Sequence, residues 1–227
     1  MIAIRVRKKY LLAALLVIAS CNRDVVEEKT APPAPPPVVV KEAAPPAVNG
    51  PKLQPVDEAG RDPSFLAYRT QLLDAVRRRD VEAIVKEVDP NIRTSFGDGG
   101  GAAELRKTLD RPEIWSELEQ ILTHGGTFQE GSFWAPYVYS AWPEKYDAFT
   151  WVAVTAKDVP LRESPNGRTI ATLAYDLVER VDETHVKTAD GRTGYVDPKF
   201  LRSPIGYRAG FNKTKERWRM TALVAGD

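Results

Sequence analysis

The chain has 227 residues and a formal net charge of +1, from 32 basic and 31 acidic side chains. That length suits one or two domains with accessory segments. The balanced charge produces no strong field toward nucleic acid, so no nucleic-acid partner is expected. A single cysteine excludes an internal disulfide bond.

The first twenty residues have the pattern of an export signal. Four basic residues precede an apolar stretch over residues 10–18, and no acidic residue lies before residue 21. A transmembrane helix needs about 20 apolar residues, so this stretch is too short to span a bilayer. The pattern predicts a signal peptide over residues 1–20.

The sequence "IASC", residues 18–21, resembles the lipobox of bacterial lipoproteins. In that family the cysteine, here Cys21, is lipidated and becomes the mature N-terminus. The resemblance implies a chain anchored in a membrane by its lipid, in the bacterial cell envelope and facing the periplasm. Asn22 stands where enteric bacteria place an aspartate for inner-membrane retention, which favours the outer membrane. The alternative is an ordinary signal peptide with a chance cysteine beside it.

Residues 21–60 are dense in proline and alanine and show no apolar period. Such a composition cannot bury a core and favours extended polyproline II geometry. We expect a disordered tether that holds the folded part away from the membrane. A second interpretation is a ligand for a proline-binding partner, because "PPAPPP" satisfies the P-x-x-P pattern.

Residues 61–150 carry helical signals. Apolar residues recur at three-to-four-residue spacing from Phe65 to Val76, and Asp80 is expected to cap a second helix. Two further helices are predicted after the "GDGGG" loop, so we interpret this range as the helical N-terminal part of an α+β domain. The aromatic residues of 127–151 are interpreted as core, with a ligand cleft as the alternative.

Residues 151–203 consist of short strand patterns separated by turn signals, which predict a small antiparallel barrel. The order of motifs in residues 159–201 resembles a bacterial SH3-like domain. The matching positions are Arg162 and Pro165, Thr172 and Leu173, and a closing pattern of Asp190, Gly191, Gly194, Tyr195, Val196, Phe200 and Leu201.

The chain departs from that family at two places. Tyr175 and Asp176 stand where many members have glycine, and His185 stands where many have tryptophan. Some members bind cell-wall peptides, so the resemblance implies a binding surface that includes Tyr175, His185 and Tyr195. As a whole, the chain resembles uncharacterised proteobacterial SH3-domain-containing lipoproteins. The expected function is therefore non-enzymatic binding to peptidoglycan or to a partner protein.

Residues 204–227 read as a β-hairpin, because apolar residues alternate from Trp218 to Val224 around a polar turn. That apolar face must be covered. We expect the hairpin to return to the helical part, so that the SH3-like barrel is inserted within one α+β domain. The helices, the glycine loop and the last strand are loosely similar to the cone-shaped fold of nuclear-transport-factor-like proteins. The alternative is a helical domain followed by a barrel with extra strands.

No pattern for catalysis, a cofactor or a metal is evident. "GDGGGA" formally fits a dinucleotide-binding loop, but the acidic residue at the required distance, Glu117, lies in a predicted helix. His124 and His185 lack the spacing of zinc ligands, and no G-x-S-x-G motif is present. The alternative function is a small-molecule-binding or hydrolytic domain with a cleft in residues 61–151 plus the hairpin.

Overall fold

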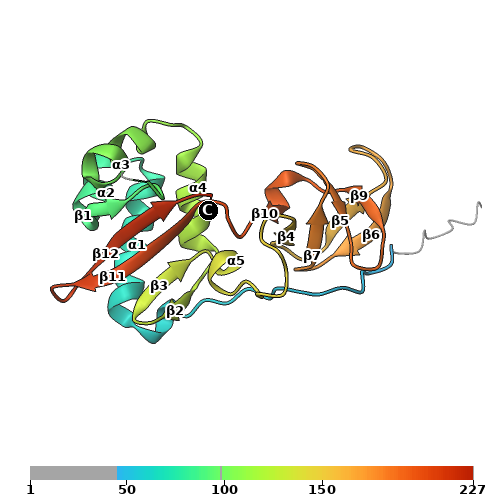
Figure 1. Ribbon diagram of the computed structural model, residues 1–227, viewed down its shortest axis with the longest axis horizontal. Coiled ribbons are helices and arrows are strands. Elements are labelled where there is room, and N and C mark those ends of the chain that lie inside the picture. Colours follow the sequence, from blue (N-terminus) through green and yellow to red (C-terminus); the bar gives the residue numbers. More distant parts are fainter. Residues whose placement is uncertain (1–44, 98, 227) are drawn as a thin grey trace, which may run out of the picture. The chain divides into compact units, whose positions relative to one another are not determined.

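The computed structural model describes residues 45–97 and 99–226 (Figure 1). The predicted signal peptide, Cys21 and the first part of the predicted tether lie outside the described residues. The described chain has a mixed α+β fold with two open β-sheets. None of its helices is long and apolar enough to cross a membrane.

The first sheet has five strands in the order β1-β12-β11-β3-β2, and only the β1–β12 pair is parallel. The strands are β1 (Val88–Arg93), β2 (Thr127–Gln129), β3 (Ser132–Ala135), β11 (Arg208–Thr214) and β12 (Arg217–Val224). The C-terminal hairpin therefore supplies two of the three inner strands of a sheet whose other strands come from residues 88–135. Its turn residues, Lys215 and Glu216, both have positive φ, as a tight hairpin turn requires.

Helices α1 to α4 pack with this sheet around one core. The helices are η1 (Ala59–Arg61), α1 (Pro63–Arg77), α2 (Val81–Glu87), α3 (Gly101–Leu109), α4 (Ile114–Thr123) and α5 (Tyr137–Ser140). Asp62 caps α1 by accepting from the backbone N–H groups of Ser64 and Phe65. Asp80 caps α2 by accepting from Ala83 N–H, as the sequence predicts.

Large aromatic rings fill the centre of this core. The ring of Phe65 lies 4.3 Å from that of Phe133, 4.9 Å from that of Trp218 and 5.5 Å from that of Phe211, measured between centroids. The three phenylalanines are fully buried. Each such ring buries a large apolar area, so this cluster contributes much of the stability of the five-stranded part.

The second sheet has seven strands in the order β10-β4-β7-β8-β9-β5-β6, all paired antiparallel. The strands are β4 (Trp151–Val154), β5 (Val159–Arg162), β6 (Thr169–Leu173), β7 (Leu177–Arg180), β8 (His185–Lys187), β9 (Thr193–Tyr195) and β10 (Leu201–Arg202), with the short helix η2 (Pro198–Phe200) before β10. In sequence, residues 151–202 lie between two parts of the first sheet.

The predicted barrel does not close. Within the described residues, the edge strands β6 and β10 do not pair with each other. Part of the free edge of β6 is already occupied, because Thr172 N–H donates to Pro46 C=O at 3.0 Å and Thr172 C=O accepts from Val48 N–H at 3.2 Å. The other edge, β10, has only two residues, which is too short a strand to continue the ladder.

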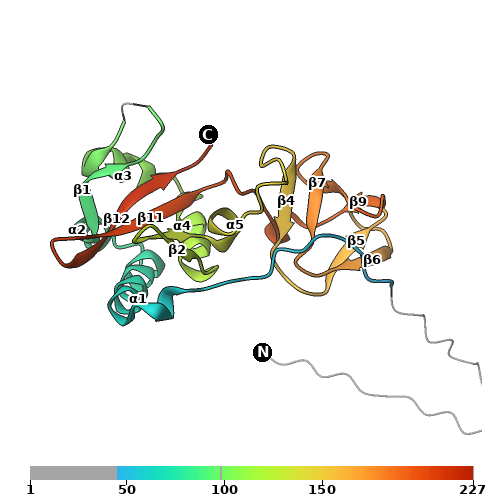
Figure 2. The same ribbon diagram turned by 60° about the horizontal axis from the view of Figure 1, so that its bottom comes forward.

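An extended segment over residues 46–57 contacts both sheets (Figure 2). Pro51 C=O accepts from Leu177 N–H at 2.8 Å, and Val56 C=O accepts from Gly126 N–H at 3.0 Å. Leu53 is buried. We predicted a tether up to residue 60, whereas the packed part of the chain begins earlier. The prolines concealed this segment, because they donate no hydrogen bond but still offer carbonyl acceptors.

Arg202 links the end of β10 to helix α4. Its side chain is 6% exposed and donates to Gln120 Oε1 at 2.8 Å and to Glu117 Oε2 at 3.1 Å. The same guanidinium donates to Tyr207 C=O at 2.8 Å, just before β11 begins. Both terminal nitrogens of the buried guanidinium are therefore paired, whereas Nε has no partner among the described residues. These hydrogen bonds hold the chain in place where it returns to the first sheet.

Candidate functional site

A groove of about 390 Å³ lies at one end of strands β5 and β9, beside η2. Its volume falls in the range of small-ligand sites. The lining residues include Pro160, Arg162, Pro165, Tyr195, Lys199 and Phe200. We call this feature the Tyr195 groove.

Tyr195 is held in the groove by its strand neighbours. It pairs with Arg162 on β5 and with His185 on β8. Gly194 allows β9 to approach β5 closely, because a Cβ at this position would lie 2.5 Å from the carbonyl oxygen of Arg162. The glycine of the "D-G-x-x-G-aromatic" pattern therefore has a packing role, and it places Tyr195 at the surface.

His185 supports Tyr195 from the side. The two rings stack with centroids 4.7 Å apart and an interplanar angle of 12°. The backbone N–H of His185 donates to Asp182 at 2.7 Å, and hydrogen bonds from the backbone of Thr184 and His185 hold the pKa of the Asp182 carboxyl below its usual range. The structure thus brings together two of the three residues predicted to form a binding surface.

Tyr175 has a different environment. Its backbone has a φ of 57°, and its ring lies 6.0 Å from the ammonium group of Lys157. Its carbonyl accepts from Leu53 N–H, so its backbone helps to hold the extended segment. Tyr175 does not line the Tyr195 groove.

The rim of the groove carries charges of both signs. Lys199 Nζ lies 2.7 Å from Asp197 Oδ2 and 4.8 Å from the centre of the Phe200 ring. The Lys199 side chain and its backbone N–H hold the pKa of Asp197 below its usual range. Arg162 donates to Gly167 C=O at 3.0 Å. An apolar floor with mixed charges at its edge suits a peptide better than a purely apolar ligand.

Sequence reasoning missed the contribution of η2. We interpreted "DPKFL" only as the end of the module, whereas Asp197 caps η2 by accepting from Lys199 N–H. This turn places Pro198, Lys199 and Phe200 in the wall of the groove. The Asp-Pro pair is a usual start signal for a helical turn, so the signal was present in the sequence.

The other residues considered for chemistry have structural roles. Gly100 is bridged to Arg93, and a Cβ on it would lie 2.8 Å from Ile92 C=O. The glycine loop therefore fits tightly against the end of β1. His124 lies 2.9 Å from Gln120 C=O through Nδ1, and burial lowers the pKa of its imidazole. The described residues contain no cluster of potential metal ligands.

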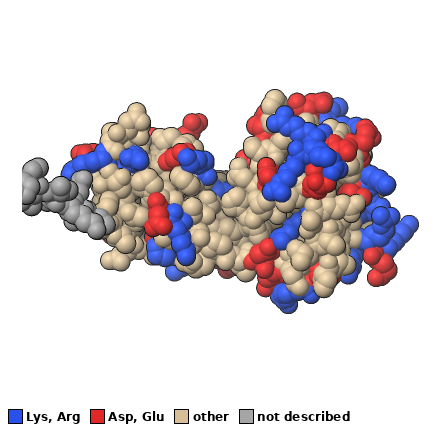
Figure 3. All heavy atoms as spheres, turned by 180° about the vertical axis from the view of Figure 1, so that it is seen from behind, with Lys and Arg blue, Asp and Glu red and all other residues tan. Residues whose placement is uncertain are grey.

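Charged side chains of both signs are intermixed over the face shown in Figure 3. Many charged side chains of the described residues form exposed pairs, such as Arg106 with Glu82 and Lys187 with Glu179. Such pairs contribute little stability individually. Recognition on that face would depend on local groups rather than on a broad field of one sign.

Comparisons with known proteins give little further information. No family model matches this chain, and no curated protein matches it. The similar solved structures include one titled "Rd1NTF2_05 with long sheet", with 13% identity and a TM-score of 0.27 over 73% of this chain and 97% of that chain. A substituted variant of the same protein has 14% identity and a TM-score of 0.29, over 71% and 95%. TM-scores this low support no conclusion about the fold or function of this chain.

Proposed function

We propose that this chain is a lipid-anchored protein of the bacterial cell envelope that binds peptidoglycan peptides through the Tyr195 groove. In this proposal residues 151–203 are an SH3-like module, Cys21 carries the lipid, and the folded part faces the periplasm. Asn22 favours the outer membrane as the site of anchoring. A partner protein in the envelope is the alternative ligand for the same groove.

One observation carries the proposal. Several of the residues that carry the family resemblance line a single groove, although they lie far apart in the sequence: Arg162 and Pro165 precede Tyr195 by about thirty residues. Val196 and Phe200 line it as well. If these residues served only to complete the sheet, there would be no reason for an aromatic ring, prolines and charged side chains to line the same groove.

The groove has the chemistry that a short peptide requires. Tyr195 and Phe200 are only partly buried, so their rings can pack against methylene groups of a ligand. Arg162 and Lys199 can attract carboxylates, and Asp197 can attract an ammonium group. Peptides of the cell wall carry both kinds of charge.

The lipid anchor is tested separately. Cells expressing the full chain should incorporate labelled palmitate into it, and Cys21→Ala should abolish the label. Labelling that persists in the variant would contradict the lipoprotein assignment. This result would not bear on the groove.

The binding function is tested by co-sedimentation with purified sacculi. The compact unit of residues 43–227 should pellet with sacculi. Tyr195→Ala should weaken binding about tenfold, as expected when an aromatic anchor is truncated. Phe149→Ala is the matched control, because Phe149 is 64% exposed and does not line the groove. Equal binding by both variants would contradict the proposal.

A second candidate function is small-molecule binding by the α+β part. A cavity of about 470 Å³ lies between residues 94–111 and the base of the hairpin, where that alternative places its cleft. A lack of sacculus binding, together with a melting temperature that rises with a metabolite, would favour this second function.

A further inference from the structure

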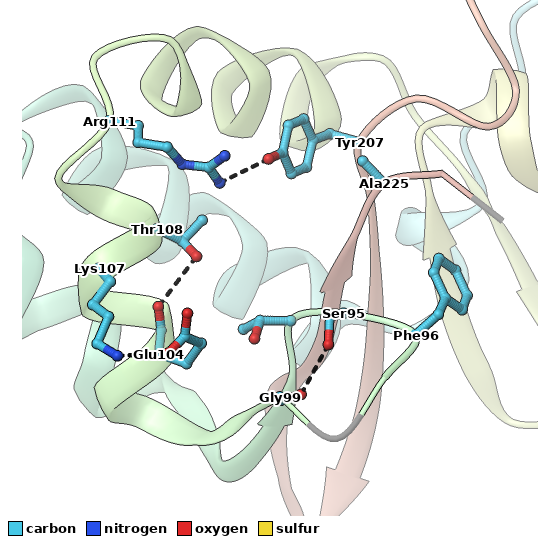
Figure 4. Close-up of a pocket in the computed structure, with 10 residues that line it drawn as sticks. Ser95, Phe96, Gly99, Glu104, Lys107, Thr108, Arg111, Tyr207 and Ala225 are labelled. Atoms are coloured by element: carbon cyan, nitrogen blue, oxygen red, sulfur yellow. Dashed lines mark hydrogen bonds and ion pairs between the residues drawn. The ribbon is translucent and has the colours of Figure 1, made fainter.

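The larger cavity of the α+β part lies beside α3, between the loop that follows β1 and the base of the β11–β12 hairpin (Figure 4). Its volume of about 470 Å³ is in the range of small-ligand sites. We call it the Arg111 cavity. It shares no lining residue with the Tyr195 groove, so it is independent of the proposed function.

The charges in the wall of this cavity leave one cation without an anionic partner. Lys107 Nζ lies 3.0 Å from Glu104 Oε2, so these two charges compensate each other. Arg111 instead donates to the neutral hydroxyl of Tyr207 at 2.7 Å. Among the contacts of the described residues, no carboxylate pairs with Arg111. Among the described residues of the wall, one positive charge is therefore uncompensated.

A buried hydroxyl in the same wall also lacks a partner. Thr94 Oγ1 is buried and forms no hydrogen bond within the described part of the protein. Buried hydroxyl groups are nearly always hydrogen-bonded, so this one is an exception that needs an explanation. Thr94 lines the cavity, but its oxygen is buried away from the cavity, so ligand binding there depends on Arg111 and not on this hydroxyl.

An exposed aromatic ring stands at the edge of the cavity and is held in place by cations. The ring of Phe96 is 46% exposed and lies 5.1 Å from the guanidinium carbon of Arg208 and 5.5 Å from that of Arg93. Arg208 is itself buried, stacks over Tyr139 at 4.8 Å and donates to Gly226 C=O at 2.8 Å. Phe96 thus offers an apolar surface at a fixed position.

We propose that the Arg111 cavity binds a small molecule that carries a single carboxylate group. The guanidinium of Arg111 binds the carboxylate through paired N–H donors. The body of the ligand packs against Phe96 and Tyr207. A phosphate dianion fits less well, because the described wall offers only one uncompensated positive charge to its two negative charges.

The test uses the full chain purified in detergent and ligand-observed NMR titrations. The probes are benzoate, lactate, benzamide and inorganic phosphate. At least one of the two carboxylates should bind saturably, and benzamide and phosphate should bind about tenfold more weakly. That ratio is the size expected for the loss of one charge-assisted contact.

Two variants locate the binding. Arg111→Gln should weaken carboxylate binding about tenfold, whereas Arg106→Gln should leave it unchanged because Arg106 pairs with Glu82 outside the cavity.

Several results would overturn the proposal. They are the absence of saturable binding by either carboxylate, equal binding of phosphate, and equal affinity of Arg111→Gln and the unsubstituted chain. Binding of sacculi does not depend on Arg111, so the Arg111→Gln variant should still pellet with sacculi if the Tyr195 groove binds them. The two proposals can therefore fail separately.

Discussion

The core under the five-stranded sheet contains large aromatic rings, whereas the core of the seven-stranded sheet contains mainly valine, leucine and alanine. In the first region Phe65, Phe133 and Phe211 are fully buried. In the second region Tyr195 and Phe200 are only partly buried and line a groove. The rings of Phe65, Phe133 and Phe211 therefore stabilise the first part, whereas the rings of Tyr195 and Phe200 are available to a ligand. Other rings, such as those of Tyr137 and Trp151, pack with residues of β4 and β7 on the seven-stranded sheet.

The second region has a further source of stability, which is the extended segment over residues 46–57. Val48 belongs to the small aliphatic core, and Lys52 forms an ion pair with the buried Asp176. A small sheet with few large buried side chains has a limited hydrophobic core. We therefore expect the seven-stranded part to depend on this segment more than its proline-rich sequence suggests.

The largest effect should follow from removing the hairpin. Truncation after Ser203 deletes β11 and β12, two of the three inner strands of the five-stranded sheet, and leaves β1 without a partner strand. We expect the α+β part to lose cooperative unfolding, measured by circular dichroism during thermal denaturation. Retention of a single sharp transition with unchanged helical signal would show that the hairpin is dispensable.

The next largest effect should come from the aromatic core. Phe65→Ala removes the ring that contacts Phe133, Phe211 and Trp218. The free energy of unfolding should fall by about 3–5 kcal/mol, as for other buried phenylalanines, in urea titrations. Phe149→Ala, at a 64% exposed site, should change it by less than about 0.5 kcal/mol. A loss below about 1 kcal/mol for Phe65→Ala would argue against ring burial as the main stabilising term.

The extended segment can be tested at its ion pair. Lys52→Met leaves the fully buried carboxylate of Asp176 without its cation, which lies 2.8 Å away in the native protein. Because Lys52 is partly exposed, we expect a loss of about 2 kcal/mol rather than the full penalty for a buried charge. Lys187→Met breaks an exposed pair with Glu179 and should cost less than about 0.5 kcal/mol. Similar losses for both variants in urea titrations would mean that the segment contributes no special stability.

The smallest effects distinguish two buried tyrosines. Tyr68 donates to Glu87 C=O at 2.7 Å and accepts from Met220 N–H at 2.8 Å, whereas the hydroxyl of Tyr137 has no partner within the described residues. Tyr68→Phe should therefore cost about 1–2 kcal/mol, and Tyr137→Phe should be neutral or slightly stabilising, by chemical denaturation at pH 7. The opposite order would contradict the two hydroxyl environments.

The same tyrosines predict a loss of stability in alkali. Burial raises the pKa of Tyr137 to about 12 and also raises that of Tyr68. An unfolded tyrosine ionises near pH 10, so the stabilisation is complete below pH 10 and declines as the pH rises toward 12. Tyr137→Phe should reduce this decline between pH 10 and 12. An unchanged pH profile in the variant would show that Tyr137 does not contribute to it.

Much of the local structure could be predicted from residue patterns. Three examples are the spacing of apolar residues in α1, the cap at Asp80 and the alternation of apolar residues in β12. Each of these features depends only on residues close together in the sequence. The covered face of the hairpin also follows from this pattern, because four alternating apolar residues must pack against something. At these positions the local sequence was sufficient to predict the structure.

The features that the sequence did not predict depend on contacts between residues far apart in the chain. The extended segment was hidden by prolines, which serve as acceptors for Thr172 and Leu177 from more than a hundred residues away. Occupation of the β6 edge by that segment also explains why the predicted barrel is an open sheet. In the groove, His185 and Tyr195 were both expected at the binding surface, but their pairing across β8 and β9 was not predicted. The Asp-Pro signal for η2 was present in the sequence, but the place of this turn in the wall of the groove depends on contacts between residues distant in the chain.

The central claim is that the Tyr195 groove binds peptidoglycan peptides. The most direct measurement is a titration of soluble peptidoglycan fragments into ¹⁵N-labelled protein of residues 43–227, followed by amide chemical shifts. The account predicts saturable shifts at Tyr195, Lys199 and Phe200, and at Arg162 across the groove, and predicts that Tyr195→Ala abolishes most of them. Shifts confined to residues 94–111, or no shifts at all, would contradict it.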